Sequence, residues 1–262
     1  MPTPPTGSAV HPMRAATASL ACELAQGLSM ATHLVGSVFA TASAAPGRLL
    51  SGSTTEPVLL VHGLGANNSC FGRMERHLHR EGYTVYAANY SCVGADIATC
   101  GTHLARQAAW LRDETGSLSA SVVAHSLGGL VLRWAMAHTW MRDWVELAVT
   151  LGSPHQGTPA ARLAPSALPG FGRIIQELRP GDTDRPFDEC LRGTARWVAI
   201  GADHDWVVPA KYARLPGSEN VRNVTVPLGG HLTLPNSSHC WQIILEELAA
   251  AEQRKAVTPA AS

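Results

Sequence analysis

A serine that could act as a nucleophile lies in the stretch VVAHSLGGLV, residues 122–131. The pattern around it is small-x-Ser-x-Gly, with the members Ala124, His125, Ser126, Leu127 and Gly128. This pattern is typical of a sharp strand-to-helix turn that exposes the serine Oγ at a helix N-terminus, where backbone N–H groups favour negative charge. Strand and helix approach closely there, and Ala124 adds only one methyl group to the more usual first glycine. The alternative is a core strand that ends in an ordinary glycine turn.

A second glycine-rich segment could supply hydrogen-bond donors to a reacting carbonyl. His62-Gly63-Leu64-Gly65 follows the apolar run VLLV. The two glycines let the backbone turn so that the N–H of Leu64 points at the carbonyl, and the N–H of Leu127, directly after the serine, is the second donor. Two such donors form an oxyanion hole, and losing one typically costs about 3 kcal/mol of transition-state stabilisation. The alternative is a turn that binds nothing. We interpret His62 as a structural residue that orients this loop rather than as a base.

The general base must be chosen among 12 histidines. If the chain order is serine, acid, histidine, the base comes late in the chain. His231 directly follows the strand-like run VTVPLGG, and Gly229 and Gly230 form a loop that can bring its ring toward the serine. His239, at the start of the terminal helix, is the rival. Three histidines precede the acid and are predicted to be structural: His125, His138 and His155.

The acid must orient the imidazole and stabilise the imidazolium. The segment AIGADHDWVVP offers Asp203 and Asp205 after the penultimate strand-like run. Two residues apart in a loop, they cannot both face His231 in the same way. The residues alone leave this choice open.

Apolar strand-like runs alternate with helical segments along the chain. The predicted strands span 58–63, 82–90, 118–126, 145–154, 195–205 and 221–231, and the predicted helices 71–81, 96–115, 127–140 and 237–255. This alternation predicts an α/β fold, with a mostly parallel central sheet and helices on both faces. Active sites in such sheets lie outside the carboxyl ends of the strands. Five residues that follow apolar runs should therefore gather at one edge: His62, Ser126, Gly152, Asp205 and His231.

Composition narrows the function classes. The chain has 262 residues, 45% of them hydrophobic, which is enough for one sizeable core. Lys+Arg and Asp+Glu are both 20 and no basic cluster occurs, so nucleic acid is not an expected partner. Without HExxH, Walker or GxGxxG motifs, no metal or cofactor is predicted. None of the six cysteines forms a CxxC pair. Cys92 and Cys100 flank a short loop-like stretch, and are either bridged or buried free thiols.

The N-terminal part of the chain allows several interpretations. Residues 1–12 are Pro-rich and predicted to be unstructured, and 13–45 form a helical segment. That segment either packs on the domain, lies at a membrane surface through 13–42, or is a cleaved signal peptide. Polar residues interrupt its apolar run, which favours the first two, so we expect a cytoplasmic or membrane-associated rather than a secreted protein. The catalytic domain is predicted at 53–253 and a tail at 254–262.

The assembled motifs resemble the α/β-hydrolase superfamily and, within it, the bacterial lipase/esterase group. VLLVHGLG, AHSLGGL, TLGSPHQGT, DWVVP and GGHLTLPNS match that group's pattern in type and order, and they span residues 57–240. The resemblance implies an α/β-hydrolase fold and hydrolysis of acyl esters. In such lipases the acid commonly stands in a D-x-x-V-P turn, which selects Asp205. Ala124 is a departure from the pattern, although some lipases of the group resemble this chain there.

The same resemblance assigns a role to each candidate residue. It implies Ser126 as nucleophile, His231 as base, and the amides of Leu64 and Leu127 as oxyanion donors. Four neighbours are expected to support them: His62, Gly63, His125 and Gly128.

Residues 155–194 form a long connection between two predicted strands, rich in Pro, Gly and charged residues. Long connections are usually functional or disordered. The resemblance implies a cap over an acyl pocket, with a short amphipathic helix in LAPSALPGFGRIIQEL; the alternative is a surface excursion without substrate contact. The spacing of Asp182, Asp184 and Asp188 suggests calcium, but we interpret them as a solvated acidic loop.

The sequence therefore predicts a serine hydrolase that cleaves carboxylic esters through a Ser-Asp-His triad and an acyl-enzyme. Two alternatives use the same scaffold: acyl transfer, or thioester or amide hydrolysis. A third is a catalytically inactive binding module. The expected partner is a small-molecule or lipid ester, and the protein is expected to be a monomer.

Overall fold

The computed structural model describes residues 47–163, 170–181, 187–227 and 229–257. The predicted tail at 1–12 and helical segment at 13–45 lie outside the described residues. None of the helices in the described ranges is both long enough and apolar enough to cross a membrane.

The described strands form one seven-stranded sheet in the order β1-β3-β2-β4-β5-β6-β7. The strands are β1 Arg48–Leu50, β2 Pro57–Val61, β3 Thr84–Ala87, β4 Ala120–His125, β5 Val145–Leu151, β6 Arg196–Ala202 and β7 Val221–Val226. Only β1 runs antiparallel to its neighbour, and all other pairs are parallel. The predicted mostly parallel sheet is confirmed. β1 was not predicted, because three residues ahead of a turn-rich segment give no periodic signal.

Helices occupy the connections between the strands. The α-helices are α2 Gly72–Arg80, α3 Ile97–Thr115, α4 Leu127–His138, α5 Met141–Trp144, α6 Ala160–Leu163, α7 Gly172–Glu177 and α8 Ser238–Val257. The short 3₁₀ helices are η1 Asn68–Phe71, η2 Asp188–Arg192, η3 Ala210–Ala213 and η4 His231–Asn236. The predicted helices at 71–81 and 96–115 correspond to α2 and α3. The predicted helix at 127–140 ends two residues early, and the separate short α5 was missed.

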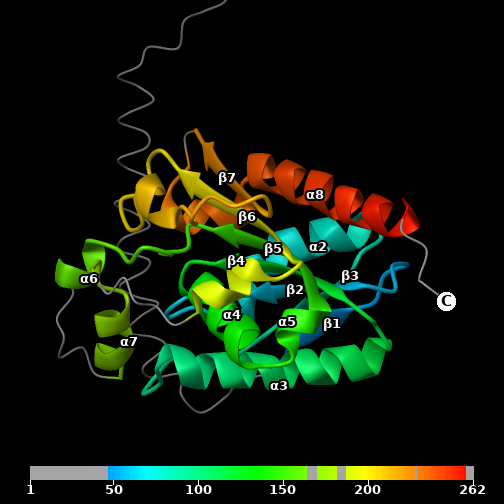
Figure 1. Cartoon of the computed structure of the whole chain (residues 1–262), viewed down its shortest axis with the longest axis horizontal. Helices are drawn as coiled ribbons and strands as arrows, with labels where there is room; N and C mark the ends of the chain where they lie inside the picture. The colour runs from blue at the N-terminus through cyan, green and yellow to red at the C-terminus, as the bar shows by residue number, and fades with distance from the viewer. Residues whose placement is uncertain (1–46, 164–169, 182–186, 228, 258–262) are drawn as a thin grey trace, which may run out of the picture.

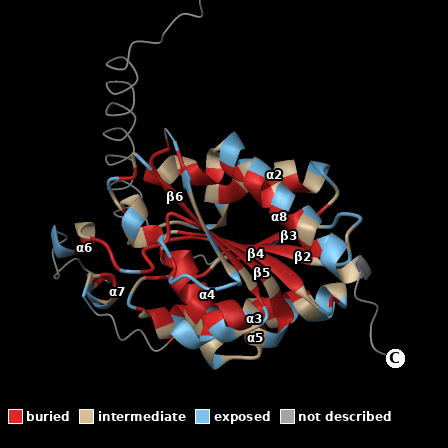
Figure 2. Ribbon diagram, turned by 45° about the horizontal axis from the view of Figure 1, so that its top comes forward, coloured by how far each residue is buried: buried red, intermediate tan, exposed pale blue. Residues whose placement is uncertain are grey.

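Both faces of the sheet are covered, as predicted. α2 and α8 lie on one face and α3, α4 and α5 on the other (Figure 1). β2 is apolar at every position because both of its faces are buried. Val58 and Leu60 face the core under α2 and α8, whereas Leu59 and Val61 face the core under α3 and α4. The central strands are buried along their length (Figure 2). This rigid double core fixes the strand ends that carry the site.

The connection at 155–194 contains three short helices in its described parts. α7 lies within the stretch predicted to be amphipathic, and buries Ile174 and Ile175 in the core that α3 and α4 share. Glu177 at the end of α7 accepts a hydrogen bond from the N–H of Ile97 at 2.9 Å. The described parts of this connection are therefore joined to the α3 side of the sheet.

Candidate active site

Ser126 occupies a strained turn between β4 and α4. It is the one non-glycine residue with a positive φ among those the structure describes, at φ 55° and ψ −128°. The first turn of α4 has no room for a side chain at Gly128. A Cβ there would lie 2.4 Å from the carbonyl oxygen of Val61 and 2.7 Å from that of His62. The helix therefore starts against the end of β2. The predicted strand–turn–helix context of the serine is confirmed.

The ring of His231 joins the serine to an aspartate. Its Nε2 lies 2.9 Å from Ser126 Oγ and its Nδ1 lies 2.8 Å from Asp205 Oδ2. A carboxylate only accepts hydrogen bonds, so Nδ1 carries the proton, and Nε2 accepts from the serine hydroxyl. His231 and Asp205 are both buried. Three positions far apart in the chain thus form one hydrogen-bonded series in the order that proton removal from a serine requires.

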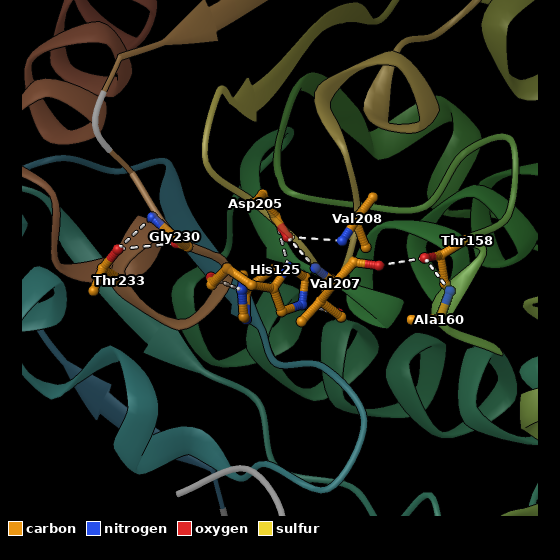
Figure 3. A network of polar contacts seen from close by, with 10 residues as sticks. His125, Thr158, Ala160, Asp205, Val207, Val208, Gly230 and Thr233 are labelled. Atoms are coloured by element: carbon orange, nitrogen blue, oxygen red, sulfur yellow. Dashed lines mark hydrogen bonds and ion pairs between the residues drawn. The ribbon is translucent and has the colours of Figure 1, made fainter. Parts of the chain in front are cut away.

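Asp205 is the aspartate of this series, and Asp203 is not. The second oxygen of Asp205, Oδ1, accepts the backbone N–H groups of Val207 at 2.9 Å and Val208 at 2.7 Å, contacts that Figure 3 shows. Asp203 is exposed at the end of β6. The amides of the D-x-x-V-P turn thus hold one carboxylate oxygen of Asp205, and the other oxygen is left to bind His231. The sequence pointed to the turn but not to these two amides.

His231 stands at the first position of η4. The N–H of Gly230 donates to Thr233 Oγ1 at 3.0 Å, and the N–H of Thr233 donates back to the Gly230 carbonyl at 3.1 Å (Figure 3). This reciprocal contact closes the turn that presents His231. The rival candidate, His239, is exposed at the start of α8.

His125 lies next to His231. Its Nε2–H donates to the backbone carbonyl of His231 at 2.9 Å, and the two ring centroids are 5.0 Å apart. Burial, together with the nearby His231 ring, lowers the pKa of His125 to about 3. The predicted structural role of His125 thus takes a definite form: a neutral residue that ties the end of β4 to the loop of the base.

His62 has a similar role in the glycine-rich loop. Its Nδ1–H donates to the Gly63 carbonyl at 3.0 Å, and its Nε2 accepts the N–H of Tyr90 at 3.3 Å. The Tyr90 hydroxyl donates to the His62 carbonyl at 2.6 Å, and the two rings stack 4.2 Å apart. Burial lowers the pKa of His62 to about 4, which keeps it neutral. The sequence missed Tyr90, whose position at the end of a predicted strand was its only signal.

The loop that carries Leu64 lies against Ser126. A Cβ on Gly63 would be 2.8 Å from Ser126 Cβ and 3.3 Å from Ser126 Oγ. Leu127 is the first residue of α4, so its N–H has no carbonyl of its own helix to bind. Gly63, the residue before Leu64, therefore lies against Ser126, and Leu127 directly follows Ser126.

Two other predicted features have different outcomes. Cys92 and Cys100 are free thiols, so the bridged alternative does not hold. Asp188 forms an ion pair with the guanidinium of Arg133, which is buried in α4. An ion pair, rather than only solvent, therefore holds that carboxylate; Asp182 and Asp184 lie outside the described residues. Within the described ranges, no group of three or more His, Cys, Asp or Glu side chains is placed to hold a metal ion.

Comparison with known proteins agrees with this geometry. Residues 56–181 match the family described as alpha/beta hydrolase fold. A triacylglycerol lipase of Vibrio cholerae is 28% identical over 135 residues, covering 50% of this chain and 42% of that protein. One of Burkholderia plantarii is 27% identical over 168 residues, covering 61% and 46%. The chain thus spans less than half the length of these relatives.

Solved structures show the same architecture. The mature lipase BlEst2 of Bacillus licheniformis superposes with a TM-score of 0.66 at 20% identity, covering 78% of this chain and 99% of that one. A thermophilic esterase of Thermogutta terrifontis gives 0.58 at 16% identity, covering 78% and 93%. The chain has the α/β-hydrolase fold. Over residues 56–181 its sequence is similar to the alpha/beta hydrolase fold family, and it is similar in sequence to two bacterial triacylglycerol lipases.

Proposed function

We propose that this protein hydrolyses carboxylic esters through an acyl-enzyme intermediate. The observation that carries the proposal is the hydrogen-bonded series from Ser126 through His231 to Asp205 at the end of the sheet. The names of the two curated relatives, both triacylglycerol lipases, support an ester as substrate. The three hydrogen-bonded residues and the strained backbone of Ser126 also argue against an inactive binding module, because such a module needs neither.

Acylation begins at Ser126. His231 Nε2 takes the hydroxyl proton as Oγ attacks the ester carbonyl, and Asp205 stabilises the imidazolium that forms. The amides of Leu64 and Leu127 donate to the oxyanion of the tetrahedral intermediate. His231 then gives its proton to the leaving oxygen, the C–O bond breaks, and the alcohol departs.

Deacylation uses the same groups in reverse. His231 removes a proton from a water molecule, the hydroxide adds to the acyl carbonyl, and the serine leaves with the proton from His231. One ester and one water give one carboxylic acid and one alcohol. The side chains present supply every proton transfer, so the reaction requires no cofactor.

The test is the hydrolysis of p-nitrophenyl butyrate by the wild type and by Ser126→Ala. We expect at least a thousand-fold loss of kcat, since the nucleophile and the proton that His231 takes are both removed. Ser119→Ala is the matched control, because Ser119 precedes β4 at the opposite end of the strand from Ser126 and bonds Glu56 and Lys255 instead. Circular dichroism verifies that both variants are folded. Retained turnover in Ser126→Ala would remove the assignment.

A further inference from the structure

A cavity with both apolar and polar lining adjoins the proposed active site on the side of α2. It has a volume of about 520 Å³ and lies between the loop that carries Leu64, the start of α2, and η4. His125 lines it next to the nucleophile, and Leu232 lines it next to the base. We refer to it below as the α2 pocket. The α2 pocket therefore borders the loop that carries Leu64 and the residues that adjoin Ser126 and His231 in the chain.

The α2 pocket has a positive lining. Arg73 and Arg76, three residues apart and therefore on the same side of α2, both line it. Within the described residues neither arginine forms an ion pair, and no aspartate or glutamate lines the pocket. The one carboxylate of α2, Glu75, is fully buried and held by Arg48. Two like charges at this spacing repel each other, and a bound anion would offset that repulsion.

The pocket lies on the side of the site that suits the leaving group. In the proposed reaction the carbonyl oxygen faces Leu64 and Leu127, whereas the alcohol oxygen faces His231, which protonates it. One wall of the α2 pocket is η4, the helix that begins with His231, and the loop that carries Leu64 forms another. The described parts of the 155–194 connection pack on the opposite face, in the apolar core that α3 and α4 share. The α2 pocket, beside α2, therefore lies on the other face of the sheet from the described parts of that connection.

We propose that the α2 pocket binds an anionic group, a carboxylate or a phosphate, on the alcohol part of the ester, and that Arg73 and Arg76 select such substrates. This rests on the proposed ester hydrolysis and specifies its substrate class. The guanidinium groups donate charge-assisted hydrogen bonds to the anion, and the amide of Asn236, which also lines the pocket, is a further donor.

The experiment compares two butyrate esters that differ only in charge: 3-(butyryloxy)benzoate and 3-(butyryloxy)benzamide. We expect the wild type to prefer the benzoate, and Arg73→Gln and Arg76→Gln each to lower the ratio of kcat/KM for benzoate over benzamide by about fivefold to tenfold, the size of one charged hydrogen bond at a partly solvated site. Raising the salt concentration from 50 to 500 mM should reduce the preference.

Two controls make the result decisive. Arg80→Gln alters an exposed arginine of the same helix that does not line the pocket, and should leave the ratio unchanged. p-Nitrophenyl succinate, measured against p-nitrophenyl butyrate, places the anion on the acyl part. The inference is overturned if the wild type does not prefer the benzoate, if Arg80→Gln lowers the ratio equally, or if only the acyl anion depends on Arg73 and Arg76. Failure to hydrolyse any neutral ester would instead refute the proposed function.

Discussion

Gly152 provides a sharp test of the site geometry. This residue follows β5 at φ 55°, where a Cβ would lie 2.9 Å from Leu234 Cδ1, 3.0 Å from Asp205 Oδ2 and 3.2 Å from His231 Nδ1. Nonbonded atoms are most stable at about 3.5–4.0 Å, so Gly152→Ala must displace the Asp205–His231 pair by about 0.5 Å. A misplacement of about 1 Å can cost 10²-fold in rate. We therefore expect Gly152→Ala to lower kcat for p-nitrophenyl butyrate by about tenfold.

Gly116 is the matched control for this change. It has nearly the same backbone conformation, φ 62°, at the end of α3, but a Cβ there meets nothing within 4 Å. Both alanine variants should lose about 1–2 kcal/mol of unfolding free energy because a side chain strains left-handed backbone. Crowding in the core adds about 1–3 kcal/mol for Gly152→Ala alone.

The assay separates stability from catalysis. Urea unfolding curves define conditions in which both variants are folded, and kcat is measured there. Gly116→Ala should keep the wild-type kcat. Equal kcat values for the two variants would refute the claim that Gly152 leaves room for the acid and the base.

Two further outcomes follow from the site. Asp205→Asn should lower kcat by about 10³- to 10⁴-fold, because the imidazole of His231 loses the partner that fixes its tautomer. Asp203→Asn should leave kcat unchanged. Parallel rate measurements check both variants, and equal losses would contradict the assignment of the acid. His62 and His125 are held neutral with pKa values of about 4 and about 3, so between pH 6.5 and 4 the unfolded chain binds protons that the folded protein does not. Unfolding free energy should therefore fall as the pH drops through this window, by up to about 1.4 kcal/mol per pH unit for each histidine. Urea titrations from pH 7 to 4 measure this slope, and an equal slope in His62→Gln would exclude His62 as a source.

The architecture could be predicted because the strands of a parallel sheet are buried on both faces. β2 and β4 are rich in apolar residues and buried throughout. His62 directly follows β2, and Ser126 directly follows β4. The rule that such ends meet at one edge predicts from the sequence that Ser126, Asp205 and His231 lie together. β1 and α5 were missed because three or four residues carry too little periodicity to identify an element.

The parts of the site that could not be predicted are contacts of the backbone. Asp203 and Asp205 have the same side chain, and what separates them is that the amides of Val207 and Val208 converge on one of them. The hydrogen bond from His125 to the carbonyl of His231 is also a contact with the backbone. Every residue has a carbonyl, so the sequence does not indicate which one His125 binds. The sequence gives the side-chain types directly. Which backbone groups bind those side chains depends on the turns of the folded chain.

These backbone contacts also explain how a strained serine is tolerated. The N–H of Ser126 donates to the carbonyl of Leu151 at 2.9 Å, and its carbonyl accepts the N–H of Gly129 at 3.1 Å, so both of its peptide groups are held although φ is positive. Strain of this kind costs about 1–3 kcal/mol and persists only where the surroundings over-determine it. Buried strands on either side of β4 supply that constraint. The rigid sheet therefore keeps Oγ within 2.9 Å of His231 before any substrate arrives, which is the preorganisation that the proposed reaction requires.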